Sequence, residues 1–226
     1  MPSRVVFDIE TLALPFDSFD EAQQAYLLHG AHTATEREEM LQKLNLYPLT
    51  AQVIAIAMLN PDTNKGNVLY QTPEPEQWVS DDEMIEFIGG NEHQILEQFW
   101  KTIEKYEQII SFNGRTFDGP FLMIRSAVLG VKPSRNLVPY RYSPKDHCDL
   151  LDQLTFYGAF RRFSLDFYCK AFGIKSPKSE GITGLSLGEL YRNGEYRRIA
   201  QYCLGDTIAT AELFRRWDLY LNFSEE

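Results

Sequence analysis

The segment Gln52–Leu59 (QVIAIAML) constrains the fold more than any other part of this chain of 226 residues. Its apolar residues follow one another without alternation, so a strand formed here is apolar on both faces. Such a strand lies inside a sheet and needs other elements packed above and below it. The chain is 44% hydrophobic and 24% charged, which supplies one full-sized core and excludes a disordered chain.

Further short apolar runs predict strands before and after this segment. The sequence predicts strands at Arg4–Ile9, Asn67–Gln71 and Gln108–Phe112, and the turn residues 61–66 make the second of these the return strand of a hairpin. Loops are expected over 73–82, over the basic stretch 132–145 and over the Gly-rich stretch 174–188.

Helix signals dominate the remainder of the chain. Thr35 and Glu38 have capping-box spacing at the start of a helix through Leu44, and Asn91 is a good N-cap for a helix over 92–106. Other helices are expected over 117–129, 148–156, 164–172 and 195–221, the last being the longest. A hairpin followed by helices and strands in alternation predicts a mixed sheet with helices packed on it.

The charge is unevenly distributed along the chain. The net charge is −10, but residues 1–110 carry 6 Lys and Arg against 19 Asp and Glu, whereas residues 111–226 carry 16 against 13. The second half could therefore form a local positive patch, the alternative being only a solvated acidic face in the first half.

Cysteine usage and hydropathy indicate a cytoplasmic protein. Cys148, Cys169 and Cys203 are an odd number without C-x-x-C spacing, so we expect core thiols rather than a disulfide framework or a zinc ribbon. No targeting peptide is visible. No apolar stretch reaches the roughly 20 residues that span a bilayer, so no membrane partner is expected.

Two carboxylates interrupt the first predicted strand. Asp8 and Glu10 are two residues apart, so both point to one face, while Phe7 and Ile9 point to the other. Like charges side by side on a buried strand repel each other and lose hydration, and a hard divalent cation with oxygen ligands relieves both costs. The alternative is a strand with one wet face, but the preceding apolar residues favour a core strand.

Asp118 follows the fourth strand where the chain passes into a helix. Ligands of α/β sheets are held at the carboxyl ends of strands, so Asp118 is a candidate for the same site. The alternative is that Asp118 only caps its helix.

Tyr202 and Asp206 are four residues apart in the last predicted helix, so they lie on one helix face. Asp is unfavourable in a helix interior and so calls for a reason there, as does the neighbouring Gly205. The alternative is a solvent-facing Asp beside a Tyr packed in the core.

Together these residues resemble the three motifs of the DEDD superfamily of 3′–5′ exonucleases. The matching segments are Phe7-Asp8-Ile9-Glu10-Thr11, Asn113-x-x-x-Phe117-Asp118 and Tyr202-x-x-x-Asp206, in that order. The last spacing resembles the subclass with tyrosine rather than histidine. The chain is most similar to stand-alone bacterial proteins related to the exonuclease domain of family B DNA polymerases.

The resemblance implies an RNase H-like α/β fold with a mixed five-stranded sheet and helices on both faces. It implies a single domain over residues 1–226 with a helical insertion at about 13–50. It also implies two divalent ions, Mg²⁺ or Mn²⁺, held by four carboxylates, with Tyr202 orienting the attacking water. Asp8 would bridge both ions, Glu10 and Asp206 would complete one site, and Asp118 would serve mainly the other.

The expected activity is metal-dependent hydrolysis from the 3′ end of nucleic acid, most simply single-stranded DNA. Two alternatives are a non-catalytic nucleic-acid or partner-binding module on the same fold and an endonuclease of the RNase H type.

Substrate contacts are expected from residues beside the motifs and from basic residues in the second half. Leu12 is a candidate wedge against the terminal base, and Arg115 is a candidate phosphate contact. Thr11, Asn113 and Phe117 are further candidates within the motifs. Cations that could contact phosphates elsewhere are Lys132, Arg135, Arg141, Lys145, Arg161 and Arg162.

Overall fold

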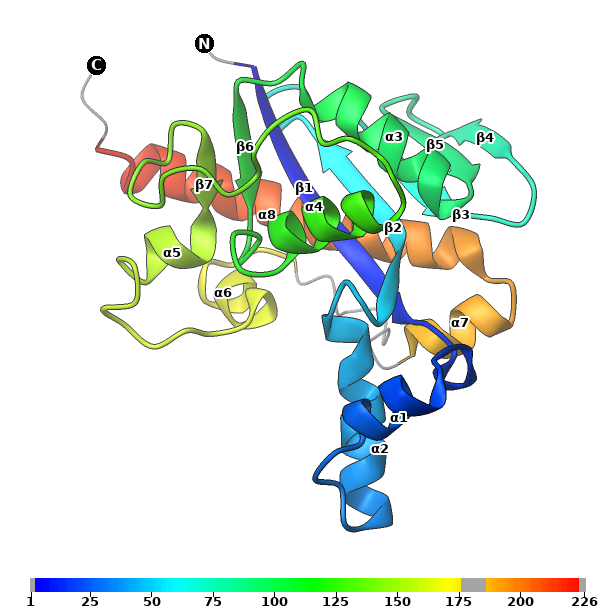
Figure 1. Cartoon of the computed structure of the whole chain (residues 1–226). Coiled ribbons are helices and arrows are strands. Elements are labelled where there is room, and N and C mark those ends of the chain that lie inside the picture. Colours follow the sequence, from blue (N-terminus) through cyan, green and yellow to red (C-terminus); the bar gives the residue numbers. More distant parts are fainter. Residues whose placement is uncertain (1–2, 176–185, 224–226) are drawn as a thin grey trace.

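Two long antiparallel strands form the centre of the sheet. They are β1 (Arg4–Ala13) and β2 (Ala51–Leu59), in a computed structural model that describes residues 3–175 and 186–223. Eight of the nine residues of β2 are buried, as its unbroken apolar sequence predicts. The two-sided apolar strand therefore lies inside the sheet (Figure 1).

Five more strands extend the sheet to either side, in the order β4-β5-β3-β2-β1-β6-β7. On one side β3 (Gly66–Gln71) returns antiparallel to β2, β5 (Ile85–Gly90) is parallel to β3, and β4 (Glu76–Val79) is antiparallel to β5. On the other side β6 (Gln108–Ser111) is parallel to β1, and β7 (His147–Asp149) is parallel to β6. The sheet is therefore mixed, as predicted, and the hairpin is confirmed.

The prediction of five strands is wrong, because the sheet contains seven. Part of the segment 73–82, predicted as a loop, forms β4, and the start of the predicted helix 148–156 forms β7. Both strands are short enough that pairing with a neighbour, rather than their own sequence pattern, decides their conformation. The expected loop over 174–188 lies mostly outside the described residues.

The helices follow the predicted order. They are α3 (Glu92–Ile103), α4 (Asp118–Val128), α5 (Leu150–Leu154), α6 (Leu165–Ala171), α7 (Leu187–Arg192) and α8 (Tyr196–Tyr220). Asn91 caps α3 with a complete capping box, as predicted, and α8 is the longest helix, with 25 residues.

The sheet separates two apolar cores. On one face Phe7, Ile9 and Met58 pack with residues of α3 and α4 such as Phe99 and Leu122. On the other face Val6, Ala57 and Val68 pack with residues of α8 that include Cys203 and Phe214. Helices therefore cover both faces of the sheet, which confirms that part of the prediction (Figure 1).

The segment predicted as a helical insertion leaves the sheet as an arm between β1 and β2 (Figure 1). It contains η1 (Phe16–Ser18), α1 (Glu21–Leu27), α2 (Ala34–Lys43) and η2 (Leu44–Leu46). The capping box of α2 is formed by Thr33 and Glu36, not by Thr35 and Glu38. Both pairs have the required spacing, so spacing alone does not select between them. Among residues 3–175 and 186–223, no helix combines the length and hydrophobicity that crossing a bilayer requires.

A buried ion pair joins α3, α4 and β2. Arg125 donates from Nε and Nη2 to the two carboxylate oxygens of Glu92, each at 2.8 Å. The same carboxylate accepts a hydrogen bond from the backbone N–H of Val53 at 2.8 Å. Glu92 and Arg125 are only 9% and 7% exposed, so the loss of one partner would leave an uncompensated charge in the core.

We predict that Arg125→Met lowers the free energy of unfolding by about 3–5 kcal/mol, because it leaves the Glu92 carboxylate buried without its cation. Chemical denaturation measures this loss. The control is Arg198→Met, which removes an exposed pair with Glu195 and should cost about 1 kcal/mol or less. Equal effects of the two variants would contradict the prediction.

A buried histidine joins β7 to β6 and to the loop before it. The imidazole of His147 contacts the Ser111 hydroxyl through Nε2 and the Leu137 carbonyl through Nδ1, both at 2.7 Å. Burial lowers the pKa of His147 from its usual 6.5 to about 3. The side chain is therefore a neutral structural group, which agrees with its expected place in the core.

We predict that His147 makes the protein less stable as the pH falls. The unfolded chain takes up a proton near pH 6.5, whereas the folded protein does so only near pH 3. In this window the unfolded state binds more protons, so stability decreases by up to about 1.4 kcal/mol per pH unit on acidification. Relative to wild type, His147→Gln should be less stable at pH 7 and the difference should shrink by pH 4. A difference independent of pH would contradict the prediction.

Candidate active site

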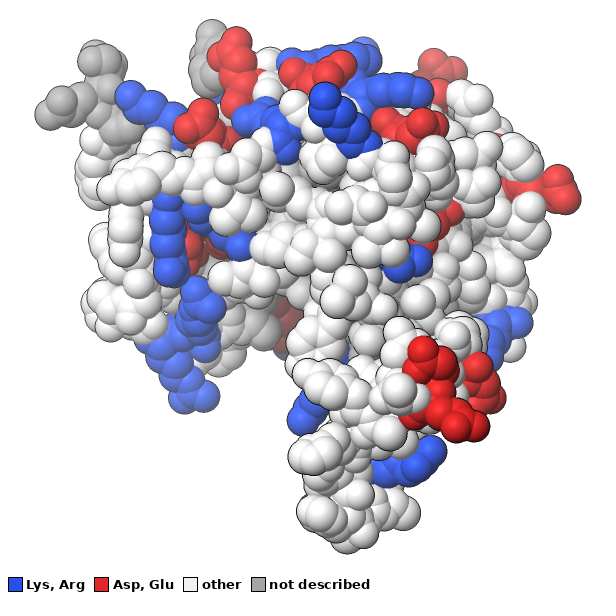
Figure 2. All heavy atoms as spheres, viewed as in Figure 1, with Lys and Arg blue, Asp and Glu red and all other residues white. Residues whose placement is uncertain are grey.

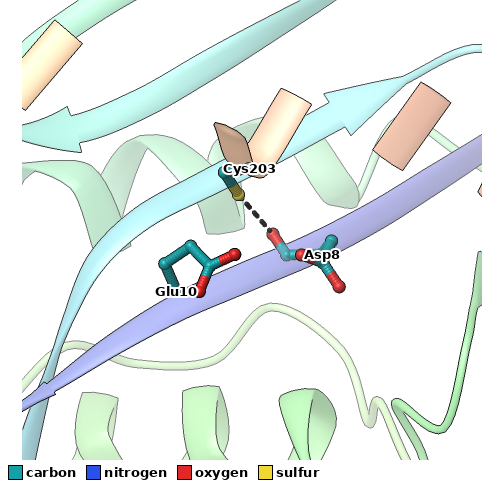
Figure 3. A group of neighbouring side chains, drawn as sticks. All are labelled: Asp8, Glu10 and Cys203. Carbon is teal, nitrogen blue, oxygen red and sulfur yellow. Dashed lines mark hydrogen bonds between the residues drawn. The ribbon is translucent and has the colours of Figure 1, made fainter. Parts of the chain in front are cut away.

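The carboxylates of Asp8 and Glu10 lie on one face of β1, the face covered by α8. The neighbouring Phe7 and Ile9 pack into the opposite core. Figure 3 shows Asp8 and Glu10 on β1 with Cys203 of α8 beside them. Ligand atoms of these three residues lie within 4.8 Å of one another. The strand alternation expected from the sequence is therefore present.

Two alanines of β2 lie beside the carboxylates. Asp8 pairs with Ala57 and Glu10 pairs with Ala55 in the antiparallel register, and both alanines are fully buried. Directly paired residues of neighbouring strands lie on the same face. The small side chains therefore leave space beside each carboxyl group.

The thiol of Cys203 is a neighbour of the carboxylates rather than a metal ligand. Its Sγ donates to the backbone carbonyl of Asp8 at 3.5 Å (Figure 3). Burial raises the pKa of the Cys203 thiol well above its ordinary value, and the charges of Asp8 and Glu10 raise it further. The protonated thiol is a poor metal ligand, because metals bind the thiolate. All three cysteines are free and buried, as expected.

Asp118 reaches β1 between the two strand carboxylates. It is the first residue of α4 and is 4% exposed, and its Oδ1 accepts a hydrogen bond from the backbone N–H of Ile9 at 3.1 Å. The N-cap residue of α4 is Phe117, which makes no side-chain capping bond. Asp118 therefore joins the strand rather than acting only as a helix cap.

A second aspartate, which the sequence analysis did not select, fixes the turn before α4. The carboxylate of Asp149 accepts from the backbone N–H groups of Asn113 at 2.9 Å and Arg115 at 3.0 Å. Asn113 has a φ of 66°. At Gly114, a Cβ atom would lie 2.4 Å from the Ser111 hydroxyl oxygen, so only glycine fits without a shift. Asp149 was detectable only as a helix N-cap signal in the sequence.

The third strand–helix contribution comes from α8. The side chain of Tyr202 hydrogen-bonds to that of Asp206, one turn further along the helix. Burial raises the pKa of Tyr202 well above its usual 10, and the charges of Asp206, Glu10 and Asp8 add to this. The phenol is therefore neutral at physiological pH and lies within the electrostatic influence of the carboxylates.

The four carboxylates raise one another's pKa. Burial is the largest cause of the raised pKa of Asp8 and of Glu10, and the charges of Asp118 and Asp206 come next. Burial raises the pKa of Asp118 to about 7, although its hydrogen bond from Ile9 opposes the shift. The structure therefore brings Asp8, Glu10, Asp118 and Asp206 into one electrostatic cluster, with Tyr202 beside it. We call these four residues the carboxylate cluster.

The carboxylate cluster suits a divalent cation. Within residues 3–175 and 186–223, no Lys or Arg forms an ion pair with Asp8, Glu10 or Asp118. The donors are carboxylate oxygens, which Mg²⁺ and Mn²⁺ prefer. A bound cation would offset the repulsion that raises the pKa values.

Two expected substrate residues beside β1 have different surroundings. Thr11 is 7% exposed, and its hydroxyl donates to the Asn45 carbonyl at 2.7 Å, which joins β1 to the arm. Leu12 is half-buried and packs against the core on the α8 side, near Gly188 of α7.

The expected substrate residues before α4 lie in or beside the turn. Arg115 is 7% exposed, and its Nη2 donates to the Pro139 carbonyl, while its buried Nη1 has no hydrogen-bond partner among the described residues. The Asn113 side chain accepts from the Thr116 hydroxyl at 2.6 Å. Phe117 is half-buried and contacts the ring of Phe121.

The fold is similar to that of a much longer protein. The chain matches a family B DNA polymerase from the hyperthermophilic archaeon Pyrobaculum calidifontis with a TM-score of 0.61 and 18% sequence identity. The match covers 96% of this chain and 24% of the polymerase, so the chain spans about a quarter of that protein. The likeness supports the RNase H-like fold of an exonuclease domain. No functionally curated protein matches the chain.

A family match covers most of the sequence. Residues 48–224 match the family described as "Predicted 3'-5' exonuclease related to the exonuclease domain of PolB". The matched range contains Asp118, Tyr202 and Asp206, whereas Asp8 and Glu10 precede it and are placed beside them by the structure. The chain therefore belongs to the family of predicted 3′–5′ exonucleases related to the exonuclease domain of PolB.

Proposed function

We propose that the chain is a metal-dependent 3′–5′ exonuclease of the tyrosine subclass that degrades single-stranded DNA. The convergence of four carboxylates from β1, α4 and α8 in one buried cluster carries this proposal. Family membership supports the reaction class. We further propose that residues 1–226 act as one exonuclease domain with the arm as an insertion, and that the protein is cytoplasmic.

The proposed roles follow the positions of the side chains. Asp8 would bridge two divalent ions, Glu10 and Asp206 would complete one ion site, and Asp118 would serve mainly the other. Two such ions activate a water molecule and stabilise the leaving oxygen of a phosphodiester. Tyr202 would orient that water by hydrogen bonding, because its neutral phenol can donate and accept.

The reaction needs only water as co-reactant. A water oxygen forms a bond to phosphorus while the bond from phosphorus to the 3′ oxygen of the preceding nucleotide breaks. The proton lost by the water balances the one gained by the leaving 3′ oxygen. The products are a nucleotide with a 5′-phosphate and a strand shortened by one residue. Leu12, Asn113, Arg115 and Phe117, together with Thr11, remain the proposed substrate contacts around this reaction.

We predict that Asp8→Asn and Asp118→Asn each reduce digestion of a 5′-labelled oligonucleotide with Mg²⁺ or Mn²⁺ by at least about a hundredfold, the scale of losing one group that stabilises the transition state. Substrates should include single-stranded DNA, duplex DNA and RNA, with each end blocked in turn.

The matched control is Asp17→Asn, which changes an exposed carboxylate outside the carboxylate cluster and should digest like wild type. Wild-type turnover by either cluster variant would contradict the proposal. Retained strand binding without divalent-ion binding would instead favour the non-catalytic module. Cutting of a circular substrate would favour an endonuclease.

We predict that Asp8→Asn raises the Tm of the metal-free protein, because it removes one of the repelling charges. The gain should be about 2–4 °C for each kcal/mol of repulsion removed. It should be larger at pH 8 than at pH 5, because Asp118, with a pKa of about 7, is ionised only at the higher pH.

Addition of Mn²⁺ should raise the Tm of wild type and raise that of Asp8→Asn much less, because a ligand that binds only the folded state stabilises it. A lower Tm of the variant in EDTA, or equal Mn²⁺ shifts, would show that Asp8 is not a repelled metal ligand.

A further inference from the structure

Exposed aromatic rings gather on the flank of the molecule formed by α5, α6 and the loops beside them. Tyr140, Tyr142, Phe156, Phe160 and Phe167 are each more than half exposed, from 53% to 71%. Their rings contact one another or a neighbour: Tyr142 contacts Tyr140 and Tyr157 with centroids 5.7 and 4.9 Å apart, and Phe167 stacks on Phe163 at 4.4 Å. We call these exposed rings, with Tyr157, Phe163 and the arginines Arg141, Arg161 and Arg162, the aromatic surface.

The arginines make this surface positive. Arg141 and Arg162 both contact the buried carboxylate of Asp152, at 2.7 and 3.3 Å, so two cations share one anion. Arg161 lies over the ring of Phe163, 5.1 Å from its centroid. The segment 132–175 contains eight Lys and Arg against four Asp and Glu, although the whole chain carries −10. Figure 2 shows Lys and Arg side chains on the flank where Figure 1 places α5 and α6.

The backbone holds part of the surface in an unfavourable conformation. Phe156 and Tyr157 have φ angles of 49° and 58°, in the left-handed region that large side chains rarely adopt. Hydrogen bonds fix the turn, among them Tyr157 N–H to the Asp152 carbonyl at 2.7 Å and Gln153 to the Tyr157 hydroxyl at 2.9 Å. Strain of this kind persists where the surrounding structure over-determines it, and it concentrates at functional sites. Here it accompanies an exposed Phe156 ring.

The aromatic surface begins beside the carboxylate cluster. The ring of Phe163 contacts that of Tyr168, and Tyr168 contacts Phe112, the residue before the turn that carries Asn113 and leads to Asp118. On the next position of α6, the pKa of Cys169 is raised to about 11 by burial, and the charge of Asp206 contributes. A strand with its end in the cluster can therefore continue over these rings.

Single-stranded nucleic acid matches this combination of groups. Unpaired bases present flat faces that stack on aromatic rings, and each phosphate between them carries a charge that an arginine can neutralise. A duplex hides its base faces, so it would use only the cations. An acidic protein partner would likewise use the cations but would not need a row of exposed rings.

We propose that the aromatic surface binds the unpaired nucleotides that precede the 3′ end of the substrate strand. This rests on the proposed function for the direction of the strand, but the binding itself can be tested separately. The surface would make affinity depend on strand length, because short substrates do not reach it.

The test measures binding of labelled oligo(dT) of 2 and 12 nucleotides by fluorescence anisotropy in EDTA. The first variant is the triple substitution Tyr142→Ala, Phe156→Ala, Phe160→Ala, and the second is Arg161→Ala with Arg162→Ala. Stacking losses predict at least about a tenfold weaker affinity of the triple variant for the 12-mer. The arginine variant should also bind the 12-mer with a salt dependence reduced by about one to two contacts. Neither variant should change dinucleotide binding.

Matched controls replace exposed groups elsewhere. Tyr26→Ala, Tyr47→Ala, Leu49→Ala removes exposed apolar side chains of the arm region, and Arg37→Ala with Arg216→Ala removes two exposed cations. Both should bind the 12-mer like wild type. Wild-type affinity of the aromatic and arginine variants would overturn the proposal, as would equal losses for duplex and single strand in the aromatic variant. Unchanged Tm values show that the variants are folded, and the two-residue arginine variant tests the surface if the triple variant is not.

Hydrolysis of the dinucleotide with Mn²⁺ separates this proposal from the proposed function. If wild type cleaves no substrate but the surface variants lose 12-mer binding, the exonuclease proposal fails and the surface stands. If wild type digests both lengths and every variant binds and digests the 12-mer like wild type, the surface proposal fails and the exonuclease proposal stands.

Discussion

Repulsion among carboxylates in a buried place is the constraint on which the rest of this structure depends. Asp8 and Glu10 must share a face because they are two residues apart in a strand, and Asp118 and Asp206 are brought to the same place from two other elements. Burial raises the pKa values of the first three, which means that their ionised forms are unfavourable in the folded protein. A fold that keeps such a cluster needs a counter-charge, and a divalent cation supplies one.

The surrounding structure is organised to hold these groups close. Ala55 and Ala57 leave space beside the strand carboxylates, and the absence of a side chain at Gly114 allows the turn before Asp118 to approach Ser111. Asp149 fixes that turn through backbone N–H groups. The continuous helix α8 then places Tyr202 and Asp206 one turn apart over β1.

The sequence predicted the parts of the fold that have strong local patterns. The two-sided apolar strand β2, the hairpin to β3, the cap at Asn91 and the long helix α8 were all readable from periodicity and capping residues. The strands β4 and β7 were not, because four residues beside prolines and three residues containing His147 and Asp149 carry no strand pattern of their own. Their conformation comes from pairing with neighbours that are distant in sequence or short in length.

The same distinction applies to the site. Spacing within one element correctly predicted that Asp8 and Glu10 share a face and that Tyr202 and Asp206 share another. Spacing could not show that Asp149 holds the turn before α4, or that Arg115 is buried against Pro139, because both depend on tertiary contacts. The exposed rings from Tyr140 to Phe167 are similar, because aromatic residues in a sequence are equally consistent with a core.

The most direct test of the central claim is anomalous diffraction from crystals soaked in Mn²⁺. The account predicts two manganese peaks roughly 3.5–4 Å apart, the spacing of two-metal sites, with Asp8 between them and Glu10, Asp118 and Asp206 as further ligands. Crystals without a peak among these carboxylates, or with manganese bound only elsewhere on the protein, would contradict it.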